Sequence, residues 1–248
     1  MDWTYFTEFD FQIIWRFFPA LLSGLWNNII LTSTSFCIGG IFIGTMLAMV
    51  SMVKISIIRW VVIIFTEFWR STPLLVQAIW IHFAFPVISG LQTTPFQSAL
   101  IALTLNVSAY CSEIIRAGIL SVPKGQYEAA KSLGLPIYVS WIKIILPQAL
   151  KTVIPPLTGT IISIFKATAI LSVLAINDIM RAAQRISSYT FKPLEIYTSA
   201  AILTFLIGYL ITRFGNFMEN KFSKIDCISR SHQAASDLKK RISNFLEG

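Results

Sequence analysis

The chain has 248 residues, of which 55% are hydrophobic and 13% charged, with a mean hydropathy of +0.68 and a net charge of +8. A soluble core cannot hide so much apolar surface, so the composition predicts a polytopic membrane protein. The Lys and Arg residues stand between apolar runs and form no single stripe, which argues against a nucleic-acid-binding surface. Three scattered cysteines without CxxC or Cys/His spacing imply neither a disulfide framework nor a metal site, and no cofactor is expected.

Aromatic side chains crowd the N-terminal region between residues 3 and 18, beside a few charges. This mixture is typical of a membrane–water interface. Acidic residues stand where a secretory signal would carry basic ones, so the segment is expected to stay on the mature chain. We predict an interfacial lead-in over residues 1–22, lying on the outer surface of the membrane.

Five apolar stretches follow the lead-in, each able to cross about 30 Å of hydrocarbon as a helix. They are predicted to be transmembrane helices over residues 28–52, 60–85, 96–120, 152–176 and 195–212. The predicted fold class is therefore all-α, with a five-span domain over residues 23–220 and a basic cytoplasmic tail over residues 221–248 that is helical only in part. Gly40 and Gly44 form a GxxxG pattern in the first span, a weak indication of close helix contact.

The distribution of Lys and Arg predicts the orientation of the spans. If the loop around residue 130 is cytoplasmic, fourteen basic residues lie inside and four lie outside. The outer four are Arg16, Arg181, Arg185 and Lys192. Because cytoplasmic loops are enriched in Lys and Arg, we predict an N-terminus outside and a C-terminus inside.

A polar segment, EAAKSLGLPIYVSWIKIILP, interrupts the apolar runs from residue 128 to residue 147. Residues 126–133 are predicted to form two helical turns that Gly134 ends with a positive φ. Pro136 then suits the first turn of a second helix. Small side chains at Ala129 and Ala130 would let another protein approach the backbone closely, while Glu128 keeps the turn hydrated.

The spacing within this segment resembles the EAA loop of bacterial ABC importer permeases, which docks into a groove on an ATPase subunit. The matching docking elements are Glu128, Ala129, Ala130, Gly134, Leu146 and Pro147, within a loop over residues 121–150. Two further stretches, FWRSTPLLVQ from Phe68 and AYCSEIIRAGILSVPKGQ from Ala109, together with ILPQALKTVIPPL from Ile145, are similar to permeases of polar amino acid importers. The resemblance covers about residues 20–220.

The resemblance implies the type I importer fold in the bacterial inner (plasma) membrane. It also implies three partners: a pair of ATP-binding subunits, a second permease subunit that is identical or paralogous, and an extracytoplasmic solute-binding protein. The chain has no GxxxxGK[ST] motif, and His82 and His232 stand too far from other reactive groups to catalyse a reaction. The chain is therefore predicted not to be an enzyme, and the resemblance assigns ATP hydrolysis to a partner.

Two basic residues lie inside predicted spans, where a charge costs at least about 2.5 kcal/mol at the bilayer centre and therefore usually faces the bundle or water. Arg70 and Lys166, together with Thr168, are predicted to line the translocation pathway or to contact substrate. A structural pair between Arg70 and Glu67 is the alternative for Arg70.

The segment from Lys166 reads KATAI where the resembling family commonly has Lys-Asp-Thr-Ser-Leu. Because Ala167 replaces that acid, we predict a preference for neutral polar or acidic amino acids over cationic ones. The leading hypothesis is a permease subunit that imports polar amino acids by alternating access. The alternatives are an opine or cystine-like cargo, or an ATP-independent channel or scaffold.

Overall fold

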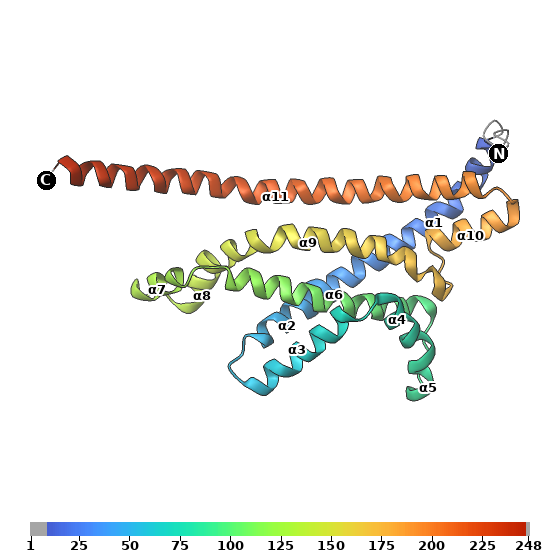
Figure 1. The fold of residues 1–248 in the computed structure, drawn as a ribbon, viewed down its shortest axis with the longest axis horizontal. Helices are drawn as coiled ribbons and strands as arrows, with labels where there is room; N and C mark the ends of the chain where they lie inside the picture. Colours follow the sequence, from blue (N-terminus) through green and yellow to red (C-terminus); the bar gives the residue numbers. More distant parts are fainter. Residues whose placement is uncertain (1–8, 247–248) are drawn as a thin grey trace.

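A computed structural model describes residues 9–246, with side chains as far as residue 219 and at Lys221. All regular elements in this range are helical, and α6, α9 and α11 run along the long axis of the molecule (Figure 1). α6 (Pro95–Leu120) contacts α9 (Leu146–Thr168), which in turn contacts α11 (Pro193–Leu246).

The first span is one continuous helix of 41 residues. It consists of α1 (Phe11–Ser35), the π-helical η2 (Phe36–Ile43) and α2 (Gly44–Ser51). The carboxylate of Asp10 caps it by accepting a 2.9 Å hydrogen bond from the backbone amide of Gln12. At about 1.5 Å per residue this helix is roughly twice as long as the hydrocarbon is thick. Over residues 11–22, the predicted lead-in is therefore the beginning of the first helix and not a separate element.

The second span is broken in its middle. α3 (Ser56–Ser71) meets the segment formed by α4 (Leu74–Ile79), η3 (Trp80–Ala84) and α5 (Phe85–Ser89) at an angle of 103°. Thr72 is extended, as expected for the residue before a proline, here Pro73. Among the described residues, four helices are long and apolar enough to cross a membrane, or five if this bent pair is one span, which agrees with the five predicted spans.

α6 lies at the centre of the bundle, and the first span contacts it through small residues. A Cβ placed on Gly44 would lie 2.9 Å from Cβ of Cys111, and one on Gly40 would lie 3.1 Å from its Sγ. The GxxxG pattern therefore marks a close helix contact within the subunit. The main core surrounds this contact and includes Leu31, Ala78, Ala99, Leu103, Val107 and Leu171.

The second half of the chain begins with two short helices, α7 (Lys124–Ser132) and α8 (Ile137–Ser140). α8 continues through η4 (Trp141–Ile145) and α9 into η5 (Ala169–Leu174), a 38-residue span. α10 (Ile179–Thr190) then contacts α1 and α11. α11 is one helix through residue 246. The prediction that the tail over residues 221–248 is only partly helical is therefore wrong for residues 221–246.

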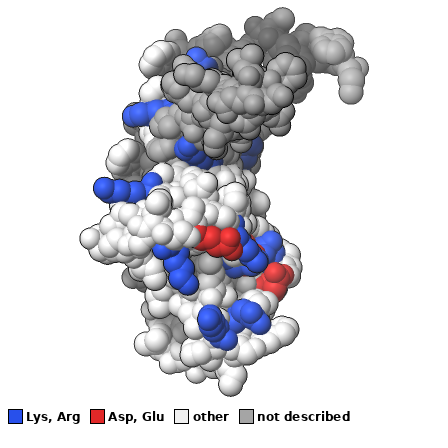
Figure 2. Space-filling view, turned by 90° about the vertical axis from the view of Figure 1, so that its left-hand side faces the viewer, with Lys and Arg blue, Asp and Glu red and all other residues white. Residues whose placement is uncertain are grey.

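The two ends of the molecule differ. α7, α8 and the C-terminus lie at one end, and α5, α10 and the N-terminus lie at the other (Figure 1). Figure 2 faces the end with α7, where Lys and Arg side chains gather and acidic ones are few. The exposed basic residues of the short loops and helices there include Lys54, Lys124, Lys131 and Lys143. These residues were all assigned to the cytoplasmic side by the charge distribution.

Candidate functional site

The turn between α7 and α8 is fixed by its own backbone. The amide of Leu135 donates to the carbonyl of Ala130 at 3.1 Å, and the amide of Gly134 donates to the carbonyl of Lys131 at 3.0 Å. This pair of bonds is a Schellman motif, which needs a left-handed residue after the helix. Gly134 has φ +67°, so the predicted positive φ is confirmed.

The two alanines of this loop face different ways. Ala129 is exposed, whereas Ala130 is only 3% exposed. The small size of Ala130 therefore serves packing inside this subunit, which corrects the interpretation that both alanines present a surface to a partner. Tyr127 holds α7 to the bundle through an edge contact with Trp141, with ring centroids 6.4 Å apart.

Large apolar side chains project from the same loop. Leu133, which follows the polar helix α7, is 76% exposed, and Ile137, which begins α8, is 81% exposed. Leu146 and Pro147, the closing residues of the motif, begin α9 and are also exposed. The loop thus combines a rigid turn with an apolar surface that is exposed in the part of the chain that the structure describes.

A cavity of about 780 Å³ lies between α3, α4, α6 and α9 at the break in the second span. The polar residues that line it are Arg70, Ser71, Thr72, Asn106, Tyr110, Thr160 and Ser163. Ala167, the position that lacks the acid common in the resembling family, also lines it. Among the described residues no Asp or Glu lines this cavity, and Arg70 contributes a positive charge to it.

Arg70 lies at the end of α3, and its guanidinium group has hydrogen-bond partners for only some of its nitrogens. Its guanidinium lies 3.4 Å from the carboxylate of Glu67, and its Cζ lies 5.7 Å from the ring centroid of Tyr110. Nε is buried and has no hydrogen-bond partner among the described residues. The predicted pair with Glu67 is present, and the same guanidinium also lines the cavity.

Side-chain amides stabilise the broken helix beside Arg70. The carbonyl of Trp69 accepts hydrogen bonds from Gln77 at 2.8 Å and from Asn106 at 3.0 Å. Asn106 also donates to the side-chain carbonyl of Gln77 at 3.1 Å. A helix end leaves carbonyls without partners, and the bilayer has no water to bind them. Gln77 and Asn106 supply those donors, and sequence reasoning missed them although Pro73 indicates the break.

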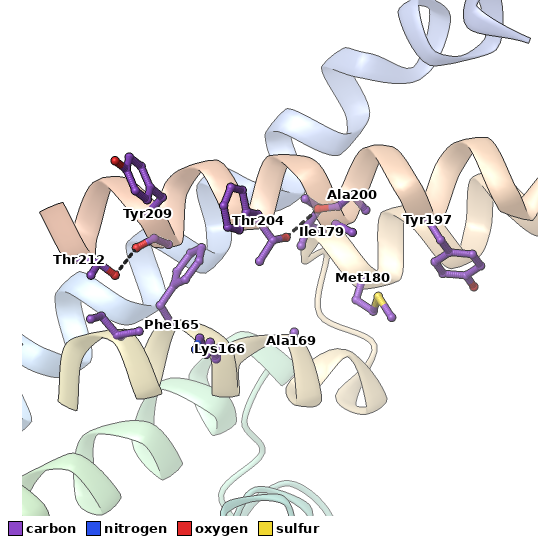
Figure 3. A pocket seen from close by; sticks show the side chains of 14 residues that line it. Phe165, Lys166, Ala169, Ile179, Met180, Tyr197, Ala200, Thr204, Tyr209 and Thr212 are labelled. Carbon is purple, nitrogen blue, oxygen red and sulfur yellow. Dashed lines mark hydrogen bonds between the residues drawn. The ribbon is translucent and has the colours of Figure 1, made fainter. Parts of the chain in front are cut away.

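Lys166 and Thr168 lie apart from this cavity. Lys166 is exposed in a second space of about 750 Å³ between α9, α10 and α11 (Figure 3). This groove is mostly apolar, and the hydroxyls of Thr204 and Thr212 bond to carbonyls of their own helix, those of Ala200 and Gly208. Thr168 is fully buried, and its hydroxyl donates to the carbonyl of Phe165 at 2.7 Å. The structure therefore separates Lys166 and Thr168 from Arg70.

At the opposite end from α7, Asp178 begins α10. Its Oδ1 accepts a 2.8 Å hydrogen bond from the amide of Arg181, while Oδ2 is buried with no partner among the described residues. Burial raises the pKa of Asp178 to about 6, although the bonds from backbone amides work against this shift.

Residues 40–224 match the family model of the binding-protein-dependent transport system inner membrane component. The chain belongs to this family. It is 39% identical to the L-cystine transport system permease protein of Bacillus subtilis, over 84% of this chain and 88% of the relative. It is 34% identical to the arginine transport system permease protein of the same organism, over 88% and 99% of the two chains.

Solved structures agree with this assignment. A crystal structure of an amino acid ABC transporter with histidines is 34% identical, has a TM-score of 0.79, and is matched over 86% of this chain and 98% of that one. The methionine ABC transporter MetNI shares the fold at 20% identity, with a TM-score of 0.67. The chain is thus an inner-membrane permease of the type I importer fold, as the resemblance implied.

Proposed function

We propose that this permease imports polar amino acids across the inner membrane, along a pathway that includes the cavity beside Arg70. The observation that carries the proposal is the half-buried, incompletely paired guanidinium of Arg70, which lines a cavity at a broken helix together with other polar side chains. Broken helices within membranes expose backbone groups where transported solutes bind. The relatives named for cystine and arginine and the amino acid transporter structure support this class of cargo.

The lining favours neutral polar or acidic amino acids. Arg70 fits a carboxylate, whereas the side chain of lysine or arginine would find no acid on the lining of this subunit. Cystine is the second candidate, supported by the 39% identical relative, because it carries two carboxylates and no net charge.

The cargo is tested with a complete transporter, containing the ATP-binding subunits and the binding protein, in proteoliposomes. Glutamine, glutamate, cystine and arginine compete for uptake of a labelled amino acid. We expect the first three to compete more strongly than arginine. Stronger competition by arginine would contradict the inference from the lining.

The energy would come from separate ATP-binding subunits that dock on α7 and α8. The exposed Ala129, Leu133 and Ile137 support this assignment, because they form an apolar surface on a rigid turn. ATP binding would close the partner pair, move this loop and tilt the bundles between inward-open and outward-open states. A second permease subunit, identical or paralogous, would complete the translocation unit.

Docking is tested by changing Ala129, because substitution of this exposed residue should not disturb folding. Ala129→Trp should prevent the ATP-binding subunits from copurifying and should abolish transport, because the added ring fills the contact surface. Ala129→Ser, a small substitution at the same position, should leave both intact. Normal copurification of the tryptophan variant would rule out this docking surface.

A further inference from the structure

α10 carries a second exposed surface, at the end of the molecule opposite α7 (Figure 1). Its apolar side is buried through Ile179, Ala182, Ala183 and Ile186. Its other side surrounds a surface hollow of about 620 Å³ with Tyr197 of α11. The α10 residues that line this hollow are Arg181, Gln184, Arg185, Ser188 and Tyr189. We call these five residues the arginine face.

Contacts with α1 and at the start of α10 fix the position of the arginine face. Asp178 caps α10, and a Cβ on Gly24 of α1 would lie only 2.7 Å from the backbone of Asp178. The side chain of Asn27 donates to the carbonyl of Asn177 at 2.7 Å, and the guanidinium of Arg185 donates to the side-chain oxygen of Asn177. α1 and the start of α10 therefore fix the orientation of the face before any partner binds.

Neither arginine of this face forms an ion pair within the described part of the subunit, although buried Asp178 attracts Arg181 electrostatically. No described carboxylate lies within salt-bridge distance of Arg181 or Arg185. Glu195 is buried and pairs with Lys192 at 3.7 Å, and Asp178 lies buried beneath the face. Arg185 is exposed and Arg181 is partly exposed, and guanidinium groups without an ion pair are suited to carboxylates on another molecule.

The location of these arginines is also unusual. Basic residues are favoured on the cytoplasmic side, and three of the four predicted outside, Arg181, Arg185 and Lys192, lie on or directly after α10. If the end with α7 is cytoplasmic, the arginine face is extracytoplasmic. Arginines clustered against the topological preference indicate a role at the outer surface.

We propose that the arginine face docks the solute-binding protein through carboxylates on that receptor. This inference rests on the proposed function, since it assigns the outer surface of the same importer. The polar hollow, formed by Gln184 and Ser188 beside the two arginines, fits a protrusion of a protein. Tyr189, 79% exposed, adds an aromatic contact of the kind enriched with arginine at protein interfaces.

The test uses the complete transporter in lipid nanodiscs and the purified binding protein loaded with amino acid. The double variant Arg181→Glu/Arg185→Glu should raise the receptor concentration for half-maximal ATPase stimulation by at least about tenfold, because it places like charges across the contact. Its ATPase activity without receptor should stay unchanged. The charge-preserving variant Arg181→Lys/Arg185→Lys should keep most of the stimulation.

Three outcomes would overturn the proposal. One is unchanged receptor stimulation in the glutamate variant, and another is an equal loss of activity with and without receptor. The third is an effect of the variant that follows the fraction of anionic lipid in the nanodisc and not the receptor concentration, which would assign the face to lipid headgroups. Uptake of an amino acid by the unaltered transporter tests the proposed function separately from all three.

Discussion

α9 presents two different faces to the two spaces beside it. Toward α6 and the broken second span it places Gly159, Thr160, Ser163 and Ala167, which are small or polar, around the cavity with Arg70. Toward α11 it places Phe165 and Lys166, which line the apolar groove (Figure 3).

Two ionisable residues within spans therefore have different surroundings. Arg70 meets polar side chains and a helix break, whereas Lys166 lies among apolar side chains on the other face of α9. A long lysine can extend its ammonium group toward the membrane surface while its methylenes cover apolar neighbours. The cavity face, and not the groove face, has the chemistry to bind a polar solute.

The largest expected effect comes from removing each charge in turn. Arg70→Gln should reduce uptake by roughly 10- to 100-fold, because a hydrogen bond to a charged group contributes about 1.5–3 kcal/mol. Lys166→Gln should change uptake by about twofold or less, as for substitutions away from special features. Glu67→Gln controls for loss of the ion pair with Arg70. Equal losses at Arg70 and Lys166, measured as initial uptake rates in proteoliposomes, would remove the distinction between the faces.

A smaller effect should follow from restoring an acid to the cavity face. Ala167→Asp should improve competition by arginine about tenfold relative to glutamate, because a carboxylate would then lie on the cavity lining. Ala169→Asp, on the groove face, is the matched control and should leave the selectivity unchanged. A similar change in both variants would show that neither face is specific.

Part of this arrangement could be predicted from the sequence. The five spans, the turn at Gly134 and the contact through Gly40 and Gly44 follow from long apolar runs and local chemistry. The orientation of Lys166 could not be predicted, because the sequence does not show which side of α9 packs against α6 and which side packs against α11. The inward orientation of Ala130 likewise depends on tertiary packing, while the break at Pro73 had a local signal.

The smallest expected effect concerns stability on the groove side, where Ile179 beside Asp178 lines the groove. The pKa of Asp178 is about 6 in the folded protein against an ordinary 3.8, so the folded state binds this proton more tightly. The resulting stabilisation is greatest below pH 3.8 and is lost as the pH rises through 6. At pH 7 the loss of this stabilisation amounts to about 3 kcal/mol relative to the protonated carboxyl.

Asp178→Asn should therefore raise the melting temperature at pH 7.5 and flatten its decline between pH 4.5 and pH 7.5, since asparagine also caps helices well. Uptake should be unaffected at its maximal rate. Melting curves of the purified protein in detergent check this expectation. If the melting temperature of the variant declines with pH as much as that of the unaltered protein, another group is responsible for the pH dependence.

The central claim is that solute crosses beside Arg70 and not beside Lys166, and substrate protection of single cysteines tests it most directly. Thr160→Cys on the cavity face and Thr204→Cys on the groove face are compared, with the native cysteines replaced by alanine. The rate of labelling by a small polar thiol reagent is measured in the assembled transporter with and without the transported amino acid. We predict that the amino acid slows labelling at position 160 and leaves position 204 unchanged; protection at 204 alone would contradict the account.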